Sequence, residues 1–232
     1  MLSRVIIQTL SLFFTAAHAS SITDAQDSWS IPGSFTNNLR VPVILGVMSR
    51  CPDALLCETL FDKVIPKVAE KIDLSLTFIA RLNSSDSEFG VTCRHGRDEC
   101  AGNVQQLCAA KYTPMNTWWE FVTCQNYEGK DRIGRPDVAL KCARTAKIDW
   151  NDSEIGRCAG EDGSGTGEEG VRLLQENIKV AEALGIIKSC TIVINGEKVC
   201  VHDGTWKDCE NGHEIKDFIR QIESEYRKLN ER

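Results

Sequence analysis

The sequence predicts an α/β domain, and three observations lead to this class. An apolar run over residues 41–47 has the length of a buried strand, and residues 72–82 alternate between apolar and polar with period two. Between them, apolar residues recur every three or four positions over residues 52–68, the spacing of a helix with one buried face. Two strands joined through a helix are expected to lie parallel, so this part of the chain predicts a strand–helix–strand unit.

The last third of the chain predicts a helix, a hairpin and a second helix. Residues 171–184 have helical spacing. Asn195-Gly196 lies between two short apolar runs and is the strongest short turn signal for a β-hairpin. An amphipathic pattern closes the chain, and Asn211 and Glu214 before it are spaced like a capping box.

Residues 83–158 interrupt the regular pattern. They hold six of the eleven cysteines and several short helical patches, but no clear strand pattern. We expect a helical insertion that disulfides cross-link, since the segment offers little continuous core. Residues 159–170 contain five glycines and four acidic residues, which predicts a mobile loop. The order of elements over residues 39–232 therefore resembles the thioredoxin-type architecture.

The N-terminus predicts a secretory signal peptide. A mostly apolar run of about a dozen residues is too short to span a bilayer, which needs about 20. Ala17-His18-Ala19 follows it and matches the small-x-small cleavage rule, so residues 1–19 should be removed. Residues 20–38 are polar, and we interpret them as a loose arm. The mature chain is expected to be secreted or to reside in the lumen of a lysosome or vacuole.

The net charge and the number of cysteines limit the classes of function that this chain can have. A formal net charge of -6 argues against a nucleic-acid partner. Asn83 and Asn151 each begin an acceptor sequon, and we expect a glycan on Asn83, with Asn151 as a second candidate. Eleven cysteines in an oxidising compartment predict a disulfide framework. Because eleven is odd, at least one thiol must stay free, pair between chains, or react.

Cys51 is the first candidate for chemistry. It follows the first predicted strand and precedes Pro52, a residue that suits the first position of a helix. At a helix N-terminus, the dipole and the unpaired backbone N–H groups favour a thiolate, which is the attacking species in thiol–disulfide exchange. The alternative is that Cys51 is one more half of a cystine.

A second segment carries a family resemblance. The residues CRHGRDECAGN at 93–103, followed after four residues by Cys108, are similar to the C-Q-H-G-x-x-E-C-x-x-N-x-x-x-x-C signature of the gamma-interferon-inducible lysosomal thiol reductase (GILT) family. Arg94 stands in the place of the glutamine, and every other fixed position matches. The resemblance implies a thioredoxin-like reductase that opens protein disulfides, often in acidic vesicles. It places Cys51-Pro52-Asp53-Ala54 on the catalytic tetrapeptide of the family.

The chain departs from the family at the resolving position. Family members with full redox activity have a second cysteine three residues after the first, and here that residue is Ala54. Cys57 is six residues from Cys51, about 9 Å along a regular helix, whereas a disulfide tolerates a Cα separation of roughly 7 Å. We therefore favour a more distant partner for Cys57. Cys57 could reach Cys51 only if the first turn of the helix unwound.

Cys190 occupies the place where the family, and thioredoxin folds generally, have a cis-proline beside the catalytic cysteine. If this alignment holds, Cys190 faces Cys51, either as a resolving thiol or as its partner in a resting disulfide. Alternatively, Cys190 bonds across the hairpin to Cys200. The sequence leaves these alternatives open.

Without the resemblance, one cluster could be interpreted as a zinc site formed by Cys93, His95, Cys100 and Cys108. The spacing matches neither a zinc ribbon nor a zinc finger, and oxidised cysteines cannot bind metal. We therefore favour disulfides at these cysteines.

We predict a thiol oxidoreductase that reduces protein disulfides through a mixed disulfide. Cys51 is the predicted nucleophile, and Cys190 and Cys57 are candidates for resolving the intermediate. The predicted partners are a disulfide-containing protein substrate and an external thiol reductant, with no cofactor, metal, nucleic acid or membrane span. The alternative is a non-enzymatic, disulfide-stabilised binding protein that kept a degenerate thioredoxin-like scaffold.

Overall fold

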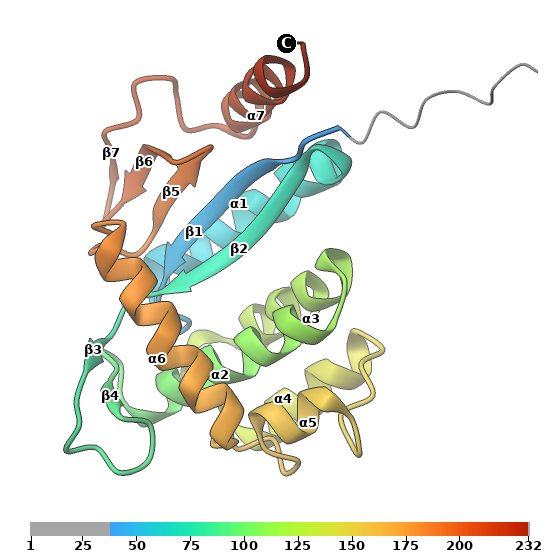
Figure 1. Ribbon diagram of the computed structural model, residues 1–232, viewed down its shortest axis with the longest axis vertical. Coiled ribbons are helices and arrows are strands. Elements are labelled where there is room, and N and C mark those ends of the chain that lie inside the picture. The colour runs from blue at the N-terminus through green and yellow to red at the C-terminus, as the bar shows by residue number, and fades with distance from the viewer. Residues whose placement is uncertain (1–37, 232) are drawn as a thin grey trace, which may run out of the picture. The chain divides into compact units, whose positions relative to one another are not determined.

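A five-stranded sheet forms the centre of the part of the chain that the structure describes, residues 38–231 (Figure 1). In this computed structural model its strands lie in the order β2, β1, β5, β6 and β7, with bounds Ile72–Phe78, Val41–Val47, Thr191–Ile194, Glu197–His202 and Trp206–Lys207. β1 and β2 are parallel, and the other neighbouring pairs are antiparallel. The predicted signal peptide at residues 1–19 lies outside the described residues, as does the predicted arm at residues 20–38 apart from its last residue.

The predicted strand–helix–strand unit is confirmed. Helix α1 (Pro52–Val68) connects β1 to β2 and buries its apolar stripe, including Phe61 and Val64, against the sheet. A short 3₁₀ turn (Ala69–Lys71) links α1 to β2. The second strand is shorter than predicted, because residues 81–82 leave the sheet as β3 (Arg81–Leu82) and pair with β4 (Val91–Thr92).

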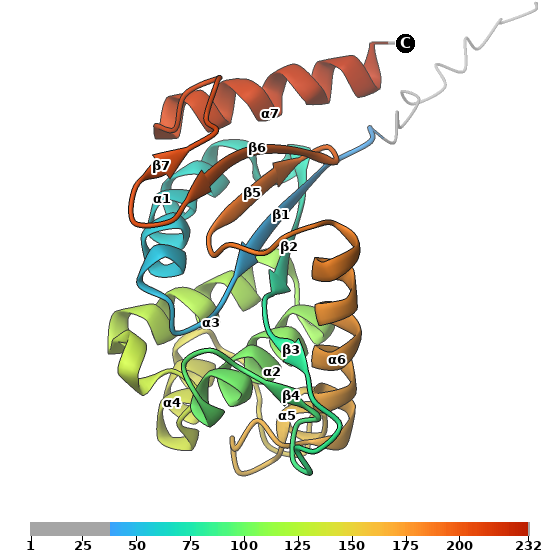
Figure 2. The same ribbon diagram turned by 90° about the vertical axis from the view of Figure 1, so that its left-hand side faces the viewer.

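The C-terminal hairpin and helix are also confirmed. Asn195 and Gly196 both have positive φ, at 51° and 84°, as a two-residue hairpin turn requires. Helix α7 (Ile215–Asn230) lies alongside α1, and the rings of Phe218 and Phe61 are 5.4 Å apart (Figure 2). The predicted capping box was one turn too early. Glu214 is itself the N-cap, and its partner is Asp217, at the third helical position.

The insertion is helical and cross-linked, as predicted. Its helices gather at one end of the sheet, below the strands in Figure 1; they are α2 (Arg97–Tyr112), α3 (Met115–Glu128), α4 (Pro136–Thr145) and α5 (Glu154–Ala159), with a 3₁₀ turn at Lys130–Arg132. Its six cysteines bond among themselves, as Cys93–Cys100, Cys108–Cys158 and Cys124–Cys142. The second bond joins α2 to α5, and the third joins α3 to α4.

The glycine-rich segment after α5 packs against the insertion, although we expected a mobile loop. Gly163 and Gly165 are buried, and the side-chain amide of Gln105 donates to the carbonyl of Gly163 at 2.8 Å. A Cβ atom at Gly165 would lie 2.5 Å from the carbonyl oxygen of Ala101, so only glycine fits there. The remaining residues of the segment begin α6 (Glu168–Ala183).

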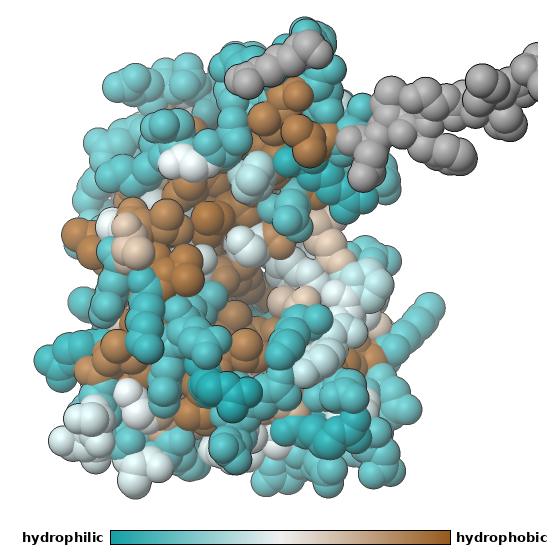
Figure 3. Space-filling model, in the orientation of Figure 1, coloured by the Kyte–Doolittle hydropathy of each residue, from teal (hydrophilic) through white to brown (hydrophobic). Residues whose placement is uncertain are grey.

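Helix α6 covers part of the sheet face opposite to α1 and α7. Near its C-terminal end, Ala181 packs with Ile186 and with Val193 of β5. Apolar residues gather over the sheet on this side, and polar residues dominate the insertion below it (Figure 3). Within residues 38–231, no helix combines the length and the apolar character that crossing a bilayer requires.

Candidate active site

Cys51 is the N-cap residue of α1, as the sequence predicted. Its backbone is extended (φ -82°, ψ 130°), and Pro52 occupies the first helical position. The Cys51 carbonyl accepts the first helical hydrogen bond, from Leu55 N at 3.1 Å. A tight turn precedes the helix, since Cys51 N donates to the carbonyl of Met48, the residue after β1, at 2.9 Å. The unpaired N–H groups of the first helical turn are therefore oriented toward the Cys51 end of the helix.

Within residues 38–231, Cys51 is the one cysteine outside a disulfide. The residue is 6% exposed. Its sulfur lies 3.9 Å from Oδ2 of Asp53 and 4.0 Å from the carbonyl oxygen of Ser189. The odd cysteine of the sequence is thus a thiol at a helix N-terminus, held between α1 and the segment that enters β5.

Cys57 and Cys190, the other two candidates, are bonded to each other. Their Cα atoms are 6.2 Å apart across a sequence separation of 133, and both residues are fully buried. The prediction that Cys57 pairs with a cysteine other than Cys51 is confirmed. The bond fastens the second turn of α1 to the start of β5.

Both pairings that we considered for Cys190 were wrong. The hairpin register places Cys200 opposite Ile192, while Cys190 exchanges two backbone hydrogen bonds with His202. Cys200 instead bonds to Cys209. The Ser189–Cys190 peptide bond, beside Cys51, is cis.

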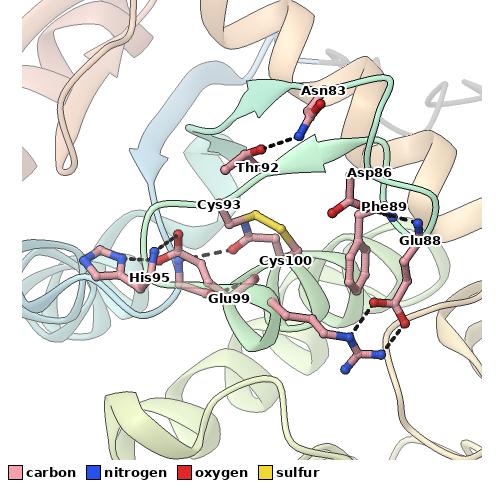
Figure 4. The surroundings of a disulfide bond; sticks show 12 residues. Asn83, Asp86, Glu88, Phe89, Thr92, Cys93, His95, Glu99 and Cys100 are labelled. Atoms are coloured by element: carbon pink, nitrogen blue, oxygen red, sulfur yellow. Dashed lines mark hydrogen bonds and ion pairs between the residues drawn. A yellow bond between two sulfur atoms is a disulfide. The ribbon is translucent and has the colours of Figure 1, made fainter.

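The signature segment positions the turn before Cys51. Figure 4 shows Cys93 and Cys100 joined as a disulfide, with His95 and Glu99 pointing toward one another beside it. The Glu99 backbone carbonyl accepts a hydrogen bond from Ser49 Oγ at 3.3 Å, and Asn103 Oδ1 accepts one from Ser49 N at 3.2 Å. Because Ser49 lies two residues before Cys51, the insertion and the nucleophile candidate are directly connected.

A metal site at this signature is excluded by the sulfur chemistry. Cys93 bonds to Cys100, and Cys108 bonds to Cys158, so none of the three sulfurs is a free thiolate. His95 Nδ1 is occupied by Glu99. The zinc alternative was therefore wrong, and this segment is structural.

A family model described as gamma interferon inducible lysosomal thiol reductase (GILT) matches residues 42–146, a stretch that contains both Cys51 and the complete signature. This stretch of the chain is similar to the GILT family. It is 27% identical over 136 residues to GILT-like protein 1 of Drosophila melanogaster, with 52% of this chain and 53% of the relative covered. The chain thus spans about half the length of this curated relative.

Solved structures show that this chain has the thioredoxin-like fold of the DsbA oxidoreductases. The MdbA protein, a thiol-disulfide oxidoreductase from Corynebacterium diphtheriae, matches with a TM-score of 0.54 and 17% identity, covering 81% of this chain and 86% of that one. Oxidised PaDsbA1 matches with a TM-score of 0.50 and 11% identity, covering 90% and 96%.

Asp53 and His202 form a polar pair at this site that the sequence did not predict. Oδ1 of Asp53 binds Nδ1 of His202 at 2.6 Å and also accepts the backbone N–H of Gly204 at 3.0 Å. Asp53 lies in the first turn of α1, where an acidic residue is ordinarily interpreted as compensation of the helix dipole. Nothing local in the sequence indicates that it meets a histidine 149 residues later.

Glu58 is a buried acid in the second turn of α1. Burial raises the pKa of its carboxyl to about 7, although a hydrogen bond from Asn126 opposes the rise. Asn126 Nδ2 donates to Oε2 at 2.6 Å, while Oε1 of Glu58 and Oδ1 of Asn126 have no partner among the described residues. A proton on Glu58 converts one unpartnered acceptor into a donor, so the environment favours the neutral acid.

We expect Glu58 to make the protein more stable at acidic pH. Its pKa is about 7 when folded, against an ordinary value of 4.5. Between these values the folded state holds a proton that the unfolded state has released, so this contribution is complete below pH 4.5 and is lost as the pH rises through 7. The difference amounts to about 3 kcal/mol. Urea unfolding at about pH 5 and about pH 7.5, on either side of the folded pKa, measures most of it.

Two variants separate this effect from other titrations. Glu58→Gln keeps an acceptor for Asn126 but cannot titrate, so it should remove this part of the pH dependence. Glu70→Gln changes an acid whose side chain is 94% exposed and should leave the dependence intact. Equal pH dependence in the Glu58→Gln variant and the wild type would contradict the assignment.

Proposed function

We propose that this protein is a thiol oxidoreductase that reduces protein disulfides with Cys51 as the nucleophile. The observation that carries the proposal is the state of Cys51, a thiol at the N-cap of α1 while the ten other cysteines are bonded. A helix N-terminus stabilises the thiolate, which is the attacking species. The similarity of residues 42–146 to the GILT family and the thioredoxin-like fold support the same chemistry.

The first step forms a mixed disulfide. The Cys51 thiolate attacks one sulfur of the substrate disulfide, so a bond forms between Cys51 and that sulfur, and the other substrate sulfur leaves as a thiolate and takes up a proton. Ala54 cannot complete the exchange, because it has no sulfur. An external thiol can do so by attacking the mixed disulfide, and two such thiols then supply the two electrons.

Cys190 and Cys57 offer an internal route for the same two electrons. When both are thiols, Cys190 attacks the Cys51 sulfur, which releases the substrate thiol and forms a Cys51–Cys190 bond. Cys57 then attacks Cys190, so that Cys57–Cys190 forms and the Cys51 thiol is released. The end point of this sequence is the arrangement in the structure, with Cys57 bonded to Cys190 and Cys51 free. Since Cys57 and Cys190 are fully buried, electrons must enter and leave through Cys51.

A single-turnover experiment tests both routes. The protein is reduced until Cys57 and Cys190 are thiols, the reductant is removed, and a peptide with one disulfide is added. Wild type should convert both sulfurs of the peptide disulfide to thiols and regain the Cys57–Cys190 bond. The variant with both Cys57→Ala and Cys190→Ala should stop at a mixed disulfide on Cys51. The matched variant with both Cys124→Ala and Cys142→Ala, which removes a disulfide of the insertion, should behave like wild type.

The outcomes distinguish three interpretations of the molecule. A wild-type reaction that stops at the mixed disulfide would overturn the internal route and leave Cys51 as the nucleophile. No adduct in any variant would overturn the enzyme proposal. It would favour the second candidate, a disulfide-stabilised binding protein, which the presence of Ala54 at the resolving position supports.

The proposed partners are a disulfide-containing protein and a thiol reductant in a secretory compartment. Five disulfides among 194 described residues fit an oxidising compartment, either outside the cell or in the lumen of a lysosome or vacuole. An acidic lumen would also suit the raised pKa of Glu58, because protonated Glu58 stabilises the fold.

A glycan on Asn83 is an expected consequence of this route. Asn83 directly follows β3, and its side-chain amide contacts Thr92 on β4 across the small two-stranded sheet (Figure 4). We expect protein secreted by eukaryotic cells to lose one glycan mass on glycosidase treatment, and Asn83→Gln to remove that loss. Asn151 is exposed between α4 and α5, so Asn151→Gln is the matched variant. An unchanged mass in wild type would contradict occupancy of both sites.

A further inference from the structure

The two oxygens of the Asp53 carboxylate contact different groups. Oδ1 is held by His202 Nδ1 at 2.6 Å and by the backbone N–H of Gly204 at 3.0 Å, whereas Oδ2 lies 3.9 Å from the sulfur of Cys51. Because Oδ1 is fixed by two donors, the orientation of the carboxylate is fixed and Oδ2 is directed at the thiol. Asp53 is therefore in direct contact with the reacting atom, and His202 acts on that atom through Asp53.

His202 is itself fixed from several sides. Its backbone N–H and carbonyl pair with those of Cys190, at 2.8 and 2.9 Å, which sets its register next to the Cys57–Cys190 bond. Its ring meets the ring of Trp206 edge to face at 4.8 Å between centroids. The His202 side chain is 10% exposed, so Asp53 is the partner that its Nδ1 has in this site. Such support is typical of a group whose orientation matters for chemistry.

A carboxylate next to a thiol would by itself oppose the reaction. Forming a thiolate 3.9 Å from an ionised Asp53 brings two negative charges together, which disfavours the thiolate. An imidazolium at His202 neutralises Asp53 and removes this repulsion. The pair can also accept the proton of the Cys51 thiol, since Asp53 and neutral His202 together carry one negative charge and have room for one proton.

We propose that Asp53 and His202 form a proton-accepting, charge-compensating pair that controls the thiolate of Cys51. The proton leaves the Cys51 sulfur and is held by the pair, so the thiolate forms next to a group of net charge zero. Asp53 contacts the thiol, and His202 is a positioning residue that orients Asp53 and compensates its negative charge. This inference deepens the proposed function and rests on it, because it requires Cys51 to be the nucleophile.

Other charged groups lie on the segments next to this site, and each pairs with a partner of its own. Asp203, in the turn after β6, pairs with Lys188 and Lys207. In the turn before α1, Arg50 pairs with Asp98. On the insertion side, the backbone carbonyl of Glu99 contacts Ser49 in the turn before Cys51, and the Glu99 carboxylate pairs with His95. The variants that test the proposal leave all these groups unchanged, so the effect of these groups on Cys51 is the same in every variant.

The test is the pH profile of Cys51 alkylation by iodoacetamide in the mature, full-length protein, with the modified residue mapped by mass spectrometry. His202→Gln leaves Asp53 uncompensated, so the profile should move to higher pH. The alkylation rate at about pH 6 should then fall roughly tenfold for every pH unit by which the profile moves. Adding Asp53→Asn to His202→Gln removes the repelling charge and should restore the wild-type rate or exceed it. His213→Gln is the matched control, because His213 also packs on Trp206, with ring centroids 5.2 Å apart, but has no contact with Asp53 in the structure, so it should leave the profile unchanged.

The decisive readout is that His202→Gln slows the alkylation of Cys51, whereas adding Asp53→Asn speeds it up again. If His202 and Asp53 had only a structural role, the double variant would react as slowly as His202→Gln or more slowly. That result would overturn the proposal. An unchanged profile in His202→Gln would overturn it as well. If Cys51 in wild type is unreactive at every pH, the proposed function fails first and this inference fails with it. Thermal unfolding of each variant identifies any loss that is due to misfolding.

Discussion

Replacing Cys51 with serine is expected to reduce mixed-disulfide formation to the uncatalysed background while leaving the protein folded. The hydroxyl of serine is not a nucleophile toward disulfides at physiological pH, and the ten other cysteines are bonded. The fold should tolerate this change well. Cys51 makes no side-chain capping hydrogen bond, and serine is among the preferred N-cap residues, so the melting temperature should stay equal or rise slightly.

Trapping with a disulfide peptide and analysis on non-reducing gels measure this prediction. Cys51→Ala serves as a second variant that removes the sulfur without adding a cap. If either variant still formed adducts, and mapping placed them on another cysteine, the assignment of the nucleophile would be wrong.

The second large effect is on stability. Removing the Cys57–Cys190 bond with a double alanine substitution is expected to lower the free energy of unfolding by about 4 to 5 kcal/mol, because the bond closes a long loop in the unfolded chain. The bond spans 133 residues and joins two fully buried positions. The Cys124–Cys142 bond spans 18 residues, so removing it should cost less, about 3 kcal/mol.

Denaturant unfolding of the two double variants provides the comparison. The Cys57/Cys190 variant should unfold at the lower denaturant concentration. The opposite ranking, or a negligible loss in that variant, would show that this bond contributes little to the folded state and would leave the transfer of electrons as its main role.

The local parts of this fold were predictable from the sequence because their causes are local. Cys51 was placed at an N-cap by an apolar run before it and Pro52 after it, and the structure confirms this. The hairpin followed from Asn195-Gly196, whose positive φ angles are a property of these two residues. The cross-linked insertion followed from six cysteines in a segment with little continuous core.

The long-range contacts were not predictable, because no local pattern encodes them. The partner of Cys190 depends on how β5 approaches α1, and the hairpin register alone suggested Cys200. The packing of the glycine-rich segment depends on an amide and a carbonyl of α2, to which composition gives no clue. The Asp53–His202 pair joins α1 to the end of β6 and is visible only once the sheet is assembled.

Glu58 illustrates the same point for a single residue. Its position on α1 is clear from the helical period, but an acid on a helix is ordinarily expected to be exposed. Its burial arises from α3, which brings Asn126 against it. A deviation of this kind from the hydrophobic pattern is recognisable only in the three-dimensional structure.

Thiol labelling of the native protein at mildly acidic pH, with the modified residues mapped, shows whether Cys51 is the reactive thiol of this protein. One cysteine should be modified, and it should be Cys51, with the other ten recovered as five cystines. Labelling at any other cysteine, or no labelling of Cys51 while the protein is folded, would contradict it.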